Sequence, residues 1–248
     1  MPDFPPAAAP RAACSSGGGR RLRAPGRLYD GVGIFWKIAF AAAMRVKARG
    51  LDHAERAAAE SGGGVLLAVS HVSHLDPVVL STLLRRRVSW MAREEFYRHG
   101  LWAWFLDRMG AFPVNRQGRA LPGIRAALSK LRAGEAVGIF PEGEIMRGVD
   151  SVLRGGPIRR GVALLAARTG VPVVPVVVSG TQRLNRVLPW LPIKSGKLWV
   201  AAGPALHAPP DTNTRAGRDA FAARLERALV EVYAELRREF PQPETEVP

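Results

Sequence analysis

The sequence contains a single cysteine in 248 residues, which excludes an intramolecular disulfide framework. Such scarcity is typical of proteins from a reducing compartment. Long hydrophobic runs are also absent. The most apolar early stretch, residues 31–44, would form a helix only about 21 Å long, short of the roughly 30 Å hydrocarbon core of a bilayer. No basic start is followed by an apolar core and a small-residue cleavage site, so we expect no secretory signal.

Acidic residues are few compared with basic ones: 21 Asp and Glu stand against 36 Lys and Arg, a formal net charge of +15. This excess predicts an anionic partner, which is nucleic acid, an anionic membrane surface or an acidic soluble molecule. Only five of the basic residues are lysine, and a chain rich in Arg, Ala, Gly and Pro is also typical of a GC-rich genome. Because no nucleic-acid reader motif is recognisable, we expect no nucleic-acid partner.

The first 48 residues divide into two segments. Residues 1–28 lack hydrophobic patterning and predict a disordered basic lead. We interpret residues 29–48 as an amphipathic helix that lies in the membrane interface, with Trp36 and Phe40 at the headgroup boundary. Packing of this helix on the domain's own core is the alternative. Basic residues flank the apolar stretch and would bind anionic lipid, which predicts a peripheral or monotopic protein on the cytoplasmic face of the membrane.

Residues 49–240 predict one α/β domain, and residues 241–248 predict a flexible tail. Short apolar or β-branched runs predict strands, and apolar residues at helical spacing predict helices. The expected strands are 65–70, 88–92, 111–114, 136–140, 171–178 and 198–202, and the expected helices are 76–86, 101–109, 121–131, 161–168 and 221–240. This alternation predicts a mixed, mostly parallel sheet covered by helices on both faces, with an N-terminal amphipathic helix.

Ionisable residues follow two of the predicted strands, in the loops 70–77 and 140–144. Active sites in α/β sheets gather at the carboxyl ends of strands. His71 and Asp76 are five residues apart, so the carboxylate can accept a hydrogen bond from one ring nitrogen and leave the other as a base. Asp76 is also explained without chemistry, as the N-cap of a helix with Pro77 in its first turn.

No protein nucleophile accompanies this pair. Cys14 lies in the N-terminal lead, and the chain has no Gly-x-Ser-x-Gly elbow. We therefore infer that the nucleophile belongs to a substrate, such as an alcohol whose proton His71 removes. His74 is a second candidate, although a loop histidine beside the site explains it more simply. A metal site on His71, His74 and Asp76 lacks a cysteine partner and a helical His-x3-His spacing, and we expect no metal.

These residues carry a family resemblance. The block from His71 to Asp76, His-Val-Ser-His-Leu-Asp, resembles the His-x-Ser-x-x-Asp block of the glycerolipid acyltransferases, the family of the 1-acylglycerol-3-phosphate acyltransferases. Three similar blocks follow in the family's order, at residues 110–116, 140–143 and 171–176. Arg159-Arg160-Gly161 and Gly180-Thr181 also stand where the family has Lys/Arg-x-Gly and Gly-Thr. The resemblance covers about residues 32–205.

The resemblance implies transfer of a fatty acyl group from acyl-CoA or acyl carrier protein to the hydroxyl of a lysolipid, in phospholipid biosynthesis. It implies that His71 is the general base and Asp76 its orienting partner. The implied substrate-binding residues are Ser73, Arg116, Glu142, Gly143, Arg159 and Arg160, with Arg116 facing the acceptor's phosphate. No metal or cofactor is implied, because a thioester donor is already activated and needs only positioning, deprotonation of the alcohol and oxyanion stabilisation.

The third block departs from the family pattern at Glu144-Ile145, where Thr-Arg is usual. A guanidinium that would bind phosphate from position 145 is therefore missing. Either Arg147, Arg159 or Arg160 replaces it, or the acceptor is not 1-acylglycerol-3-phosphate. Acylation of a different lysolipid or an amino-lipid is thus an alternative. A non-catalytic lipid-binding protein of the same fold and a hydrolase of acyl thioesters are further alternatives.

Overall fold

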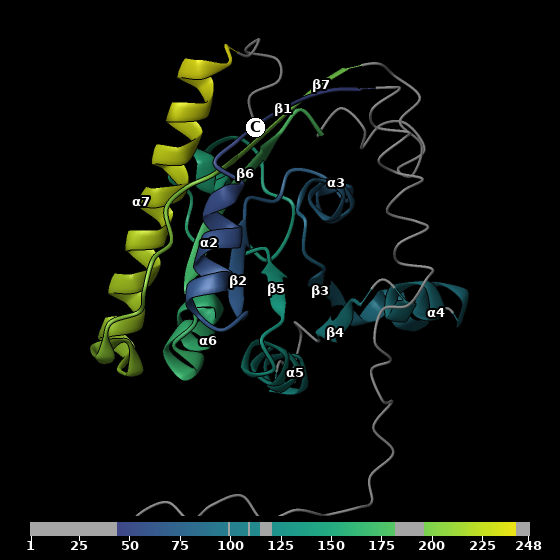
Figure 1. Ribbon diagram of the computed structural model, residues 1–248, viewed down its shortest axis with the longest axis vertical. Helices are drawn as coiled ribbons and strands as arrows, with labels where there is room; N and C mark the ends of the chain where they lie inside the picture. Colours follow the sequence, from purple (N-terminus) through teal and green to yellow (C-terminus); the bar gives the residue numbers. More distant parts are fainter. Residues whose placement is uncertain (1–43, 99, 109, 115–120, 182–195, 242–248) are drawn as a thin grey trace, which may run out of the picture.

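The computed structural model describes residues 44–98, 100–108, 110–114, 121–181 and 196–241 (Figure 1). Within them, the sheet order is β1-β7-β6-β2-β5-β3-β4. The strands are β1 (Met44–Arg49), β2 (Val65–Val69), β3 (Val88–Arg93), β4 (Phe112–Val114), β5 (Ala136–Ile139), β6 (Val173–Ser179) and β7 (Gly196–Ala202). Neighbouring strands pair in parallel except β6 and β7, which are antiparallel. The predicted mixed, mostly parallel sheet is confirmed.

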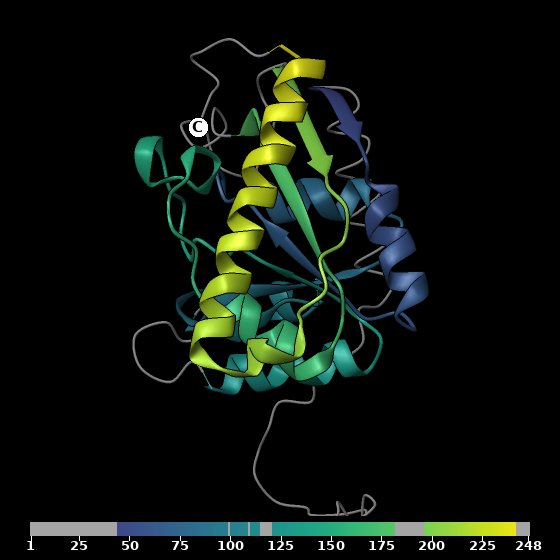
Figure 2. The ribbon, with the colours of Figure 1, turned by 90° about the vertical axis from the view of Figure 1, so that its left-hand side faces the viewer.

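Helices cover both faces of this sheet. They are α2 (Asp52–Glu60), α3 (Asp76–Leu83), α4 (Gly100–Arg108), α5 (Leu121–Arg132), α6 (Gly161–Thr169) and α7 (Arg215–Glu239), and short 3-10 turns are η1 (Glu94–Arg98), η2 (Gly148–Asp150), η3 (Val152–Arg154) and η5 (Pro210–Asn213). The helices α5, α6 and α7 pack on one face, and α2 and α3 pack on the other. In Figure 2, α7 lies lengthwise in front of β6 and β7.

The strand sequences explain why both faces are buried. Successive side chains of a strand point to opposite faces, so a strand covered on both sides is apolar throughout. In β2, Leu66 and Ala68 pack in the core under α5–α7, whereas Val65, Leu67 and Val69 pack in the core under α2 and α3. All five residues of β2 are buried, as are all seven of β6.

The end of the predicted N-terminal helical segment is a strand in the structure. Residues 44–48, which we assigned to the end of a helical segment spanning 29–48, form strand β1 together with Arg49 and pair in parallel with β7. Apolar and basic residues alternate along this segment, which is typical of a half-exposed strand, and β7 supplies its main-chain partners. The domain therefore begins before residue 49. The lead 1–28, the rest of the proposed amphipathic helix and the tail from 242 lie outside the described residues.

The sheet order brings three loops together at the carboxyl ends of neighbouring strands, which we call the carboxyl edge of the sheet. Strands β6, β2 and β5 are adjacent and parallel, so their carboxyl ends lie together. The loop after β2 begins at Ser70, the loop after β5 begins at Phe140, and β6 ends at Ser179 just before Gly180. Residues that are 71 and 105 positions apart in the chain therefore meet at this edge.

Candidate active site

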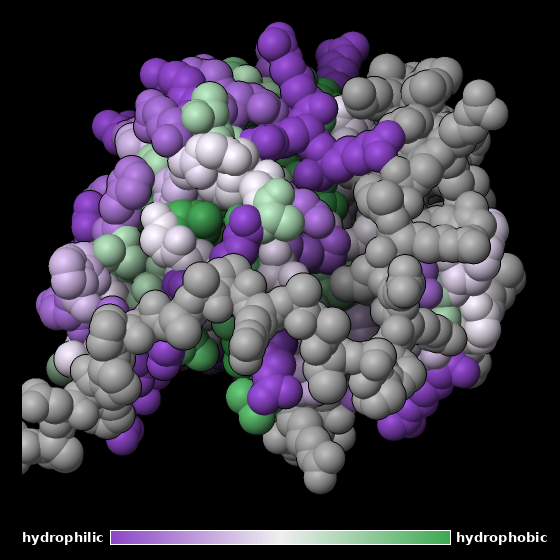
Figure 3. Space-filling view, turned by 60° about the horizontal axis from the view of Figure 1, so that its bottom comes forward, coloured by the Kyte–Doolittle hydropathy of each residue, from purple (hydrophilic) through white to green (hydrophobic). Residues whose placement is uncertain are grey.

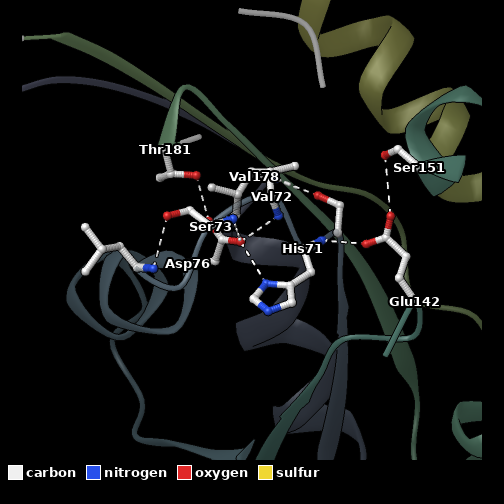
Figure 4. A network of polar contacts seen from close by, with 10 residues as sticks. His71, Val72, Ser73, Asp76, Glu142, Ser151, Val178 and Thr181 are labelled. Carbon is white, nitrogen blue, oxygen red and sulfur yellow. Dashed lines mark hydrogen bonds and ion pairs between the residues drawn. The ribbon is translucent and has the colours of Figure 1, made fainter. Parts of the chain in front are cut away.

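Asp76 is the centre of the polar network at this edge (Figure 4). Its side chain is fully buried at the start of α3. Oδ2 accepts hydrogen bonds from the backbone N–H groups of Val72 (2.9 Å) and Ser73 (2.8 Å), and Oδ1 accepts one from the Thr181 hydroxyl (2.7 Å). The sequence interpretation of Asp76 as the N-cap is wrong, because Leu75 is the N-cap and the carboxylate folds back over the preceding loop.

His71 is held on two sides. Its Nδ1 lies 3.1 Å from Oδ2 of Asp76, so the carboxylate accepts the Nδ1 proton and the lone pair is left on Nε2. The imidazole stacks on Phe140 with a centroid distance of 3.9 Å, and Phe140 stacks on Trp90 at 5.5 Å. Within the described residues, no hydrogen bond reaches Nε2, and the side chain keeps 12% exposure. The pair predicted from its spacing is therefore formed, with a free basic nitrogen.

Glu142 fixes the backbone of His71. Oε2 accepts the His71 N–H at 2.6 Å, and Oε1 accepts the Val152 N–H at 2.9 Å and faces the Ser151 hydroxyl at 3.4 Å. Burial raises the pKa of Glu142, and the backbone donors partly offset this effect. Both oxygens are occupied and the side chain is 2% exposed, so Glu142 acts on the site through the His71 backbone. A contact with substrate stays a prediction.

A tight turn presents Glu142 to this network. The Gly143 N–H donates to the Phe140 carbonyl at 3.0 Å, and Pro141 occupies the second turn position, where its fixed φ is favourable. Gly143 has φ +87°, a conformation that glycine adopts without strain. The Arg159 side chain crosses this glycine so closely that a Cβ at 143 would collide with its guanidinium.

Arg159 and Arg160 point to different partners. Arg159 donates from Nε to the Glu142 carbonyl at 3.2 Å, and one of its terminal nitrogens lies 3.8 Å from Glu144. Its side chain is 60% exposed beside the site. Arg160 instead forms an ion pair with Asp219 of α7. Only Arg159 of the two is therefore placed beside Gly143. Arg116 lies outside the described residues, and its proposed role is untested.

The remaining candidates sit within the His71 loop. Ser73 is fully buried, and its hydroxyl accepts the Leu75 N–H at 3.2 Å, which shapes the turn into α3. The His74 ring lies edge-on to His71, with 6.4 Å between centroids. Burial and the neighbouring His71 lower the pKa of His74, which favours its neutral form. In the described part of the chain, no group of three or more His, Cys, Asp or Glu side chains is placed to hold a metal ion.

Two contacts of this site are not predicted by the sequence pattern. Thr181 was noted only as part of a Gly-Thr pair, yet its hydroxyl bonds to Asp76. The aromatic contact of Phe140 with His71 also went unassigned. Phe140 directly follows β5, and Thr181 follows β6 by two residues. Their position after strands whose carboxyl ends lie at the site is the sequence feature that could have identified them.

The geometry suits removal of a proton from a bound alcohol. His71 presents a neutral Nε2, and Asp76 is ready to stabilise the imidazolium that forms. Two main-chain donors and a hydroxyl fix the carboxylate, and a ring stack fixes the imidazole. Such a site supplies base catalysis to a nucleophile that is not part of the protein.

Comparisons with known proteins agree with this chemistry. A sequence model of the Acyltransferase family matches residues 45–179. The chain is 29% identical over 145 residues to the 1-acyl-sn-glycerol-3-phosphate acyltransferase of Bacillus subtilis (strain 168), which covers 58% of this chain and 67% of that protein. It is 22% identical over 125 residues to the enzyme of the same name from Streptococcus pneumoniae (strain ATCC BAA-255 / R6), covering 50% of this chain and 44% of that one.

The fold has a counterpart among solved structures. The crystal structure of the 1-acyl-sn-glycerophosphate acyltransferase PlsC from Thermotoga maritima superposes with a TM-score of 0.63 at 20% identity, over 87% of this chain and 82% of that chain. The matched family region begins within β1 and ends with β6, so it contains His71, Asp76 and Glu142. Because this region makes up more than half of the chain, the protein belongs to the Acyltransferase family.

Proposed function

We propose that the protein is an O-acyltransferase that moves a fatty acyl group from a thioester donor to the hydroxyl of a lysolipid, in phospholipid biosynthesis. The observation that carries this proposal is the His71–Asp76 pair at the carboxyl edge of the sheet, with Nδ1 bonded and Nε2 left for a substrate. Family membership and the names of the similar proteins support the same reaction class.

In the proposed step, Nε2 of His71 takes the proton of the lysolipid hydroxyl as that oxygen attacks the thioester carbonyl carbon. The carbon–sulfur bond then breaks, and the imidazolium returns the proton to the leaving thiolate. Asp76 stabilises the imidazolium between these two proton transfers. The protein itself carries no covalent acyl group, since the acceptor supplies the nucleophile.

The acceptor that fits best has an anionic head group, with 1-acylglycerol-3-phosphate as the leading candidate. Arg159 supports this acceptor, because its exposed guanidinium crosses Gly143, next in the chain to the Glu142 that holds the His71 backbone. A guanidinium binds phosphate through paired hydrogen bonds. Glu144 lies 3.8 Å from Arg159 and competes with phosphate for it, so an acceptor with a different head group is the alternative that needs testing.

The lysolipid acceptor and the net charge of the protein both favour work at a membrane surface. A lysolipid resides in the bilayer, and the net charge of +15 favours an anionic surface and an anionic donor such as acyl-CoA or acyl carrier protein. In the described parts of the chain, no helix has the length and apolar character needed to cross a membrane. We propose peripheral association with the cytoplasmic face.

The direct test is an acceptor panel with products identified by mass spectrometry. Purified protein receives labelled acyl-CoA or acyl carrier protein together with 1-acylglycerol-3-phosphate, lysophospholipids with zwitterionic heads, or no acceptor. We expect diacylated product from 1-acylglycerol-3-phosphate. Product only from a zwitterionic lysolipid would overturn the proposed acceptor. Free fatty acid in the presence of abundant acceptor would overturn acyl transfer in favour of hydrolysis.

A further inference from the structure

We propose that Thr181 is a positioning residue for catalysis, and that its hydroxyl sets the geometry and charge of Asp76 and thereby the basicity of His71. This inference rests on the proposed role of His71 as general base. Thr181 directly follows Gly180, which lies just beyond the end of β6, and it is 105 positions along the chain from Asp76. It is fully buried, and its hydroxyl donates to Oδ1 of Asp76 at 2.7 Å.

The two oxygens of Asp76 have separate partners. Oδ2 accepts from His71, Val72 and Ser73, all of which belong to the same loop as Asp76. Oδ1 accepts from Thr181, which comes from a different strand end (Figure 4). Glu142 and Val178 hold the start of this loop, at the His71 N–H and the Ser70 hydroxyl. The Thr181 bond adds a link from the carboxylate itself to the segment after β6, and so fixes the direction in which Asp76 presents Oδ2 to His71.

The backbone around Thr181 is built for this contact. Gly180 has φ +90°, and a Cβ there would collide with the Lys197 carbonyl oxygen of β7. The chain therefore turns tightly against β7 and delivers the next side chain toward α3. A second link lies beside it, because the Val178 N–H donates to the Ser70 hydroxyl at 3.1 Å. The end of β6 and the two residues after it thus hold both the start of the His71 loop and the Asp76 carboxylate.

Loss of the hydroxyl has a definite electrostatic consequence. A hydrogen bond to an ionised carboxylate is a strong one, and removing it in a buried site leaves Oδ1 with uncompensated charge. That charge interacts more strongly with the imidazolium of His71, and protonation of His71 becomes easier. The enzyme would then lose its neutral base at a higher pH than the wild type does.

Other charged groups near the pair stay constant in this comparison. Glu142 acts on His71 from the loop after β5, His74 acts on it from its own loop, and Arg93 at the end of β3 acts on His74. None of them bonds to Oδ1 of Asp76 among the described residues. A change confined to Thr181 therefore reports on Asp76.

The test compares Thr181→Val, which keeps the shape and removes the hydroxyl, with Thr181→Ser, which keeps the hydroxyl. Thr82→Val is the matched control, because Thr82 is also buried and its hydroxyl donates to the Val79 carbonyl of its own helix. We measure kcat, KM for the acceptor and the pH profile of kcat/KM for each variant. Thr181→Ala serves as a second deletion of the hydroxyl if the valine variant folds poorly.

We expect Thr181→Val to lower kcat about tenfold or more, as loss of a hydrogen bond to a charged group predicts. In Thr181→Val, KM should stay near the wild-type value, and the acid limb of the pH profile of kcat/KM should move to higher pH. Thr181→Ser should restore both kcat and the wild-type position of this acid limb. A lower kcat with an unmoved limb, or failure of serine to rescue, would overturn the inference. An active His71→Ala variant would instead overturn the proposed base, so the two failures are distinguishable.

Discussion

Glu142 is a buried carboxylate whose two oxygens join three segments of the chain. It accepts the N–H groups of His71 and Val152 and faces the Ser151 hydroxyl. In Glu142→Gln, only one side-chain oxygen remains to accept, and the amide group would face a main-chain donor. We expect the free energy of unfolding to fall by about 1–3 kcal/mol, measured by denaturant titration, with a loss of activity. The exposed Glu144→Gln is the matched control, and an equal loss in that variant would contradict this assignment.

The effect of Glu142→Gln on the free energy of unfolding should depend on pH. Burial raises the pKa of Glu142 above its ordinary value of 4.5. Between 4.5 and the raised pKa, the folded protein holds a proton that the unfolded chain has released, so this group's contribution to stability declines as pH rises. The glutamine side chain of the variant does not titrate. The stability difference between wild type and Glu142→Gln should therefore be largest at acid pH and narrow through this window. A difference that widens would show that the pKa is lowered instead.

The His71–Asp76 pair was predictable from sequence because it is local. The two side chains are five positions apart in the chain, and only the loop and the first turn of α3 had to form correctly. The partners that hold the pair were not predictable in this way. Glu142 reaches His71 across 71 positions and Thr181 reaches Asp76 across 105, and only the pairing of β5 and β6 with β2 brings them there.

At the scale of elements, the turn at Gly143 predicts a specific loss of function. In Gly143→Ala, the positive φ costs about 1–2 kcal/mol, and the new Cβ would displace the Arg159 guanidinium. We expect lower stability together with a raised KM for the acceptor. Gly62→Ala is the matched control, since Gly62 has φ +70° in the turn before β2 and a methyl group there would have no neighbour within 4 Å. If both variants kept wild-type kinetics, Arg159 would have no role in acceptor binding.

Two threonines just before α7 are predicted to change the free energy of unfolding in opposite directions when each is replaced by valine. Thr212 in η5 is fully buried, and its hydroxyl has no hydrogen-bond partner among the described residues. Thr214 is the N-cap of α7, and its hydroxyl accepts the Gly217 N–H at 2.9 Å. We expect Thr212→Val to raise the free energy of unfolding by about 1 kcal/mol and Thr214→Val to lower it by about 1 kcal/mol. Thermal and denaturant unfolding of the two variants tests this, and equal signs would contradict it.

Strands and helices with large apolar side chains were predictable from the sequence, and those with small or charged side chains were not. The buried strands β2, β5 and β6 are apolar except for Ser179 at the end of β6, and their predicted bounds are close to the observed ones. Helix α2 was missed because its buried residues are only Ala54, Ala57 and Ala58, too small to give a clear apolar stripe. Strand β1 was missed although Arg45, Lys47 and Arg49 alternate with apolar residues as in a half-exposed strand, because these residues follow the apolar stretch 31–44 and were assigned to its helix.

At the scale of the whole molecule, charge predicts how the protein meets membranes. Among the residues coloured in Figure 3, hydrophilic side chains predominate, and hydrophobic ones show only as small separate spots. With a net charge of +15, we expect binding to vesicles that contain anionic lipid and a decline of binding as salt is added. Co-sedimentation with anionic and zwitterionic vesicles measures this. Equal binding to both, insensitive to salt, would contradict electrostatic association.

The N-terminal segment can be tested in the same assay. Deletion of residues 1–43 leaves β1 and the His71–Asp76 pair in the chain. We expect the shortened protein to bind anionic vesicles more weakly while it retains acyl transfer to a detergent-dispersed acceptor. Undiminished vesicle binding would place the membrane contact on the folded domain instead.

In the proposed reaction, Nε2 of His71 removes the proton of the acceptor hydroxyl. The most direct measurement is acyl transfer from labelled acyl-CoA or acyl carrier protein to a lysolipid by His71→Ala, beside His74→Ala from the same loop and with folding of both confirmed by circular dichroism. We predict loss of about 100-fold or more in His71→Ala and near-wild-type transfer in His74→Ala. Transfer by a folded His71→Ala at the wild-type rate would contradict the assignment of His71 as the base.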